Sequence, residues 1–123
     1  TEKVVGNFSD NLTVSAGGTF TVDVNQGSVV LGGLTTSVVT WDFTNVSGAN
    51  SKATTVTLIN RSGIGYTYGD AVNVNGAPVA SGVKWVGGNP PPATANDDIL
   101  TFSIIRDSTG VTRVYCSSSI NII

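Results

Sequence analysis

Residues 99–117 read ILTFSIIRDSTGVTRVYCS, and this stretch decides the fold class. In 99–106 apolar and polar residues alternate, as they do in a half-buried strand whose successive side chains point to opposite faces. The segment Asp107–Gly110 is typical of a turn, and 111–117 reads as a second strand. The stretch therefore predicts two strands paired as a hairpin. The residues expected to face inward are Leu100, Phe102, Ile104, Val114 and Cys116.

Similar short strand patterns recur upstream, separated by Gly, Asn, Asp and Ser, whereas helical periodicity is nearly absent. In 38–46, Val39, Trp41 and Phe43 share one face, and Trp41 is expected in the core. Eight or more short strands predict an all-β fold, specifically a single-domain antiparallel β-sandwich, jelly-roll-like, over 1–123. Within it, 1–17 is expected to be an N-terminal strand or a linker. The other expected strands are 19–24, 28–31, 53–60, 66–68, 71–74 and 83–86.

Turn residues separate these strands. Gly69-Asp70 predicts a turn, and Asn75-Gly76 predicts a tight hairpin turn because both residue types accept a positive φ. Three prolines in 87–92 remove three backbone donors, so this segment is expected to be a stiff surface loop.

Charge is sparse: 11% of the 123 residues are charged, and the net charge is −2. The cationic residues are scattered singly, so the sequence predicts no basic patch and no binding to nucleic acid, which needs clustered Lys and Arg. No apolar run approaches the roughly 20 residues of a membrane span, so membrane insertion is not expected. The cationic residues are Lys3, Lys52, Arg61, Lys84, Arg106 and Arg113.

The residue types needed for catalysis are scarce. The sequence has no histidine and one cysteine, which removes the commonest general base, the His-paired nucleophiles and any Cys/His zinc site. Asp97-Asp98 is a candidate calcium or glycosidase pair, but adjacent carboxylates on a strand point to opposite faces, and a solvated pair is the favoured interpretation. We therefore expect no enzyme activity, no metal and no cofactor.

Aromatic residues offer a candidate ligand-binding surface instead. Tyr66 and Tyr68 share one face of a short strand near Asp70, Trp85 lies just before the Gly-Pro loop, and Asn89 lies within it. Exposed rings stack on the apolar faces of sugars, so this set predicts a glycan or receptor platform. The alternative is that the rings fill the rim of the core or a subunit interface.

The chain ends in an apolar segment, Ile120-Asn121-Ile122-Ile123. Because exposed apolar tails are disfavoured in soluble monomers, the segment is expected to dock in its own sheet or against a neighbouring subunit.

Several of these segments resemble a domain of tail-fibre and virion structural proteins from marine bacteriophages, including cyanophages. The resemblance spans about 18–115, and its two earlier strands lie at 19–23 and 41–46. It departs from the family at the last hairpin, where Ser108-Thr109-Gly110 and Tyr115 replace a Gly-Gly turn and a Trp. The segments that carry it most clearly are Gly82-Val83-Lys84-Trp85-Val86-Gly87-Gly88, Pro90-Pro91-Pro92 and Asp98-Ile99-Leu100-Thr101-Phe102.

The resemblance implies a fibre-tip domain in the virion that assembles as a homotrimer, contacts other virion proteins and attaches to a glycan or protein receptor on the host surface. Two alternatives stay open. One is a monomeric carbohydrate-binding module using Tyr66, Tyr68 and Trp85. The other is a bacterial adhesin or pilin-like subunit that exchanges a strand with its neighbour, for which 1–15 is the candidate extension.

Overall fold

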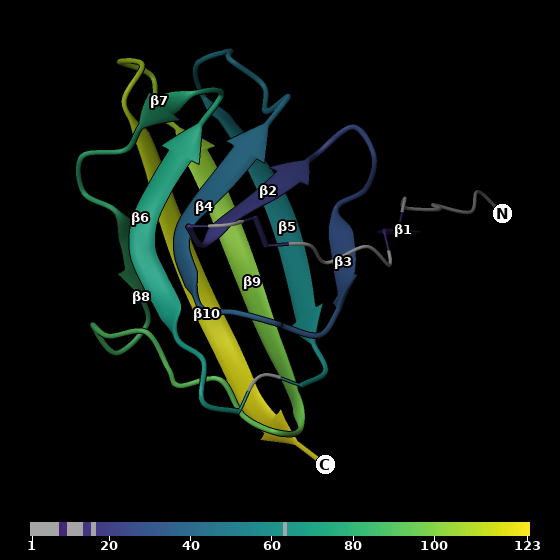
Figure 1. Ribbon diagram of the computed structural model, residues 1–123. Coiled ribbons are helices and arrows are strands. Elements are labelled where there is room, and N and C mark those ends of the chain that lie inside the picture. The colour runs from purple at the N-terminus through teal and green to yellow at the C-terminus, as the bar shows by residue number, and fades with distance from the viewer. Residues whose placement is uncertain (1–7, 10–13, 16, 63) are drawn as a thin grey trace, which may run out of the picture.

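A computed structural model describes residues 8–9, 14–15, 17–62 and 64–123. This part of the chain is built of strands and turns without a helix, which confirms the all-β class (Figure 1). The strands are β1 (Phe8–Ser9), β2 (Thr19–Asp23), β3 (Val29–Gly32), β4 (Val38–Thr44), β5 (Lys52–Asn60), β6 (Tyr68–Val74), β7 (Ala77–Pro78), β8 (Val83–Trp85), β9 (Asp97–Arg106) and β10 (Thr112–Ile122).

The first six strands wind as a short β-solenoid. The chain alternates between two sheets, so that β1, β3 and β5 lie in one and β2, β4 and β6 in the other. From β1 to β4, each strand pairs in parallel with the strand two places further along the chain. Each turn of the winding therefore adds one strand to each sheet, and the sheets face one another across a common core (Figure 1).

The C-terminal half breaks this pattern. After β7 the chain returns to the first sheet as β8, and the hairpin β9–β10 is inserted between β5 and β8, giving the order β1-β3-β5-β9-β10-β8. The hairpin is antiparallel, as predicted, with β9 also antiparallel to β5 and β10 parallel to β8.

The expected antiparallel, jelly-roll-like sandwich is therefore wrong in its pairing. Among the described strands, five pairs are parallel and three are antiparallel. The reason is that a hairpin carries a local turn signal, whereas a parallel pair is made by a long crossover that has none.

Large aromatic side chains from both sheets fill the core. Trp41 is fully buried, with ring centroids 4.8 Å from Phe102 and 5.6 Å from Phe20. The predicted inward residues of the β9–β10 hairpin are all buried. The full burial of Trp41 also confirms its predicted place in the core.

A β-bulge in β4 corrects one expectation. The N–H groups of Val39 and Thr40 both donate to the Gly18 carbonyl, at 2.8 and 3.2 Å, and the pairing with β6 shifts register between Val38 and Thr40. The extra residue reverses the alternation, so Val38 is buried while Val39, expected inward, is 55% exposed.

The predicted turn at Gly69-Asp70 is also wrong, because both residues lie inside β6, which extends the expected strand 71–74 back to Tyr68. Gly69 faces the bulge so closely that a Cβ would lie 2.5 Å from the Val39 carbonyl oxygen. This glycine therefore serves close backbone approach, not a turn. Asn75 and Gly76 do form the predicted turn, with φ of 51° and 82°.

The structure describes the N-terminal region only in part and the C-terminal segment completely. The predicted N-terminal strand or linker 1–17 lies mostly outside the described residues, although β1 falls within it. The C-terminal segment forms part of β10 up to Ile122, which agrees with the expectation that it docks in its own sheet. Ile120 and Ile122 nevertheless stay 37% and 41% exposed.

Candidate functional site

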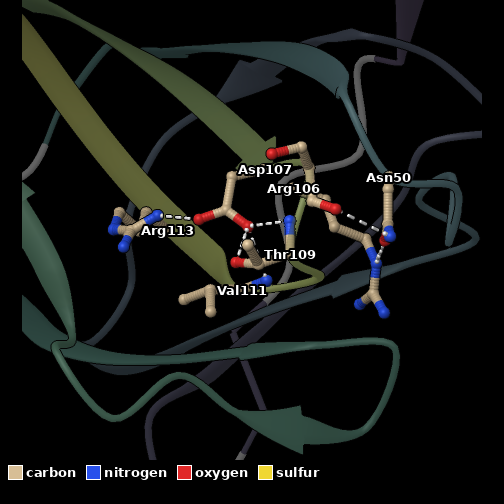
Figure 2. Close-up of polar contacts among 7 residues, drawn as sticks. Asn50, Arg106, Asp107, Thr109, Val111 and Arg113 are labelled. Carbon is tan, nitrogen blue, oxygen red and sulfur yellow. Dashed lines mark hydrogen bonds and ion pairs between the residues drawn. The ribbon is translucent and has the colours of Figure 1, made fainter.

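The β9–β10 turn is held by one carboxylate. Asp107 Oδ1 accepts hydrogen bonds from the Thr109 N–H and hydroxyl, at 2.9 and 2.7 Å, and from the Val111 N–H at 3.0 Å. Its other oxygen forms an ion pair with Arg113 at 2.5 Å (Figure 2). The hydrogen bonds from Thr109 and Arg113 hold the pKa of Asp107 well below its usual range, so the carboxylate stays charged.

A second set of polar contacts ties the same turn to the start of β5. Arg106 donates from Nε to Asn50 Oδ1 at 3.0 Å, and Asn50 Nδ2 donates to the Ser108 carbonyl at 3.3 Å (Figure 2). Gly110 packs against the guanidinium, since a Cβ there would lie 3.3 Å from Arg106 Nη2. The Arg106 guanidinium therefore lies between its hydrogen-bond acceptor Asn50 and the backbone of Gly110.

Beside this turn lies a partly open pocket of about 660 Å³, which we call the hairpin pocket. It is lined by residues from 46–48, the start of β5, 74–81, Lys84 of β8, the end of β9 and 110–113. These segments meet at the end of the molecule that carries β7 and the β9–β10 turn, opposite the C-terminus (Figure 1).

Four cationic residues contribute to the lining of the hairpin pocket. Lys52 and Arg106 occupy inward-facing positions of β5 and β9, whereas Lys84 and Arg113 occupy outward-facing positions of β8 and β10. Lys52 and Arg106, which the sequence predicts as singly scattered charges, are therefore brought together by the fold. Lys52 and Arg106 are directly opposite one another in the β5–β9 register and share the inward-facing alternation of Leu58 and Ile104. Folding gathers these charges because β5, β8, β9 and β10 are neighbours in one sheet, although they are far apart in sequence.

The cations are incompletely neutralised. The lining contains no Asp or Glu among the residues that the structure places. Arg113 is paired with Asp107, which also raises the Arg113 pKa. For Lys52, Lys84 and Arg106, no ion pair is formed within the described part of the chain. A chain of net charge −2 thus presents a locally positive pocket.

The predicted aromatic platform does not form as an exposed surface. Tyr68 and Trp85 are 2% and 7% exposed, so their ring faces are not available for stacking on a sugar, and the alternative of rings that fill the core applies to both. Trp85 donates from Nε1 to Asp70 at 2.7 Å. Tyr66 is half-buried against the core and Asn89 is exposed. The role of these two residues in binding stays a prediction.

Tyr68 instead belongs to a buried polar network. Asn60 accepts from the Leu34 N–H at 3.0 Å and donates from Nδ2 to the Tyr68 hydroxyl at 2.8 Å, which donates to Asp98 at 2.9 Å. Asp98 also accepts from the Thr94 N–H and hydroxyl. Burial and the neighbouring Asp98 raise the pKa of Tyr68, so it remains a neutral donor.

Asp98 corrects the expectation of a solvated acidic pair. It is fully buried and also accepts a hydrogen bond from the Asn121 N–H at 3.0 Å. Burial raises its pKa, but the hydrogen bonds from Thr94, Asn121 and Tyr68 outweigh that effect and leave the pKa lowered. Asp98 therefore joins β9, β6, the preceding loop and the end of β10 as a structural group.

The described side chains contain no group of three or more His, Cys, Asp or Glu that could hold a metal ion. Within the same residues, no helix has the length and apolar character to cross a membrane. Comparison with protein-family models, curated protein sequences and solved structures finds no match to this chain.

Proposed function

We propose that this chain is a recognition module of a surface appendage, such as the tip of a phage tail fibre, and that it binds a glycan on a host surface in the hairpin pocket. The observation that carries the proposal is the pocket itself, a concave site of about 660 Å³ within the size range of small-ligand sites. Its walls come from strand ends and from a turn fixed by Asp107.

The scaffold behind the pocket supports a binding role. No buried side-chain nitrogen or oxygen among the described residues lacks a hydrogen-bond partner. Such a fully satisfied interior favours a single rigid conformation, and a rigid site loses little entropy when its ligand binds. The ionisable groups with shifted pKa values are engaged in structural contacts, which fits recognition better than chemistry.

A glycan array probed with the purified chain tests this function. Ser81→Trp places a large side chain in the pocket wall, and Ser119→Trp makes the same change on β10 outside the pocket. We expect the first variant to lose glycan binding and the second to retain it. An array without any bound glycan, or binding that survives Ser81→Trp, would contradict the proposal.

Assembly as a homotrimer within the virion is a second part of the proposal. It is supported by apolar side chains that remain exposed on β10 and after it: Ile120, Ile122 and the fully exposed Ile123. Exposed apolar groups of this kind gather at subunit interfaces. Light scattering should give a trimer mass for the purified chain, and a mass that stays monomeric at high concentration would refute assembly.

A further inference from the structure

The position of Lys52 and Arg106 indicates the chemistry of the ligand. Like charges directly opposite one another on one sheet face destabilise the sheet. No carboxylate lines this pocket among the described residues. An anionic group bound between the two side chains would offset the repulsion between Lys52 and Arg106. The pair therefore favours an anionic ligand.

Arg106 is prepared for such a group. Its Nε is engaged by Asn50, while its terminal nitrogens make no hydrogen bond to any other described residue. A guanidinium fixed at Nε presents its remaining donors in a planar fork that matches the two oxygens of a carboxylate or sulfate. Arg113 differs, because Asp107 already occupies its guanidinium.

The rest of the lining fits a sugar ring better than a bare inorganic anion. The Thr54 hydroxyl and the donor proton of the Ser47 hydroxyl are available for sugar hydroxyls, whereas the Asn75 amide is already bonded to the Val46 backbone. Val74 and Val79 offer apolar contact to the ring faces. A volume of about 660 Å³ also far exceeds what a single small ion needs.

We infer that the hairpin pocket selects an acidic saccharide, with the carboxylate or sulfate of the sugar between Lys52 and Arg106. The inference rests on the proposed function and adds the chemical class of the ligand. Lys84, exposed on β8, contributes further positive charge at the rim. The association constant should therefore fall as salt is added, because exposed charges are screened.

Calorimetric titration of the full chain tests the inference. The probes are oligogalacturonate, the same oligosaccharide after chemical reduction of its carboxyl groups, a sulfated galactose oligosaccharide and inorganic sulfate. The variants are Lys52→Gln and Arg106→Gln. The matched control is Arg61→Gln, which removes the same charge from an exposed residue outside the pocket. Urea denaturation of each variant verifies folding.

We expect one or both acidic oligosaccharides to bind, and the reduced form to bind at least about tenfold more weakly, as loss of a charge-assisted hydrogen bond implies. Lys52→Gln should weaken binding similarly, while Arg61→Gln should leave it unchanged. Equal binding of the reduced form would overturn the acidic ligand but leave the glycan function standing. The inference of an acidic saccharide would also be overturned if neither acidic oligosaccharide binds, or if inorganic sulfate binds as tightly as the acidic oligosaccharides do. An empty glycan array would overturn the proposed function itself.

Discussion

The hydroxyl of Tyr68 lies at the centre of the buried polar network, and Tyr68→Phe removes it without removing the ring. The change deletes a hydrogen bond to the Asp98 carboxylate, which contributes about 1.5–3 kcal/mol. It also leaves Asn60 Nδ2 buried without its acceptor, at a cost of about 1–3 kcal/mol. Because the two effects overlap, we expect the free energy of unfolding to fall by about 3 kcal/mol, against a total of roughly 5–15 kcal/mol for a domain.

Urea denaturation followed by tryptophan fluorescence measures this loss. The midpoint should decrease while the slope of free energy against urea stays constant, because the surface exposed on unfolding is unchanged. Tyr66→Phe is the matched control, since Tyr66 is half-buried and its hydroxyl has no hydrogen-bond partner among the described residues, and it should cost less than about 0.5 kcal/mol. Equal stabilities of Tyr68→Phe and wild type, or equal losses in both variants, would refute the proposed role of the network.

Three further predictions concern other parts of the scaffold. Because the pKa of Asp98 is lowered from 3.8, its contribution to stability is present above that value and lost as the pH falls through the folded-state pKa. Thermal denaturation should therefore show a smaller acid loss in Asp98→Asn than in wild type, and an equal loss in both would contradict this role of Asp98. Burial raises the pKa of the Cys116 thiol to about 12, so its alkylation at neutral pH should require unfolding, and rapid labelling of the native chain would contradict its placement. Because the bulge in β4 buries Val38 and exposes Val39, Val38→Ala should lower the free energy of unfolding by about 2 kcal/mol, while Val39→Ser should change it little. A larger loss for Val39→Ser in urea denaturation would contradict the bulge.

Local signals predicted the parts of the fold that depend on neighbours in sequence. The β9–β10 hairpin, its inward residues and the Asn75-Gly76 turn all follow from alternation and turn chemistry. The parallel winding of β1 to β6 does not, because each parallel partner is reached through the opposite sheet. Val39 is predicted on the wrong face because the bulge depends on a backbone carbonyl far away in sequence, that of Gly18, which directly precedes β2.

The candidate site was harder to predict than the fold. Tyr68 and Trp85 carry the residue types of a sugar platform, but their burial depends on the opposing sheet, which no local pattern shows. Lys52 and Arg106 appear isolated in sequence and become neighbours only through the β5–β9 register. Local sequence predicts a solvated Asp98 beside Asp97, because the partners that bury it come from β6 and from the end of β10. In each case the decisive contact is long-range.

The central claim is that ligand is bound in the hairpin pocket, and amide chemical shifts measured by NMR during titration with a bound glycan test it most directly. We expect the shifts to concentrate at 52–54, 104–106 and 110–113, which line the pocket at the β9–β10 end of the molecule (Figure 1). Shifts concentrated instead at 66–70 and 85–92, the loops around Tyr66 and Asn89, would contradict it.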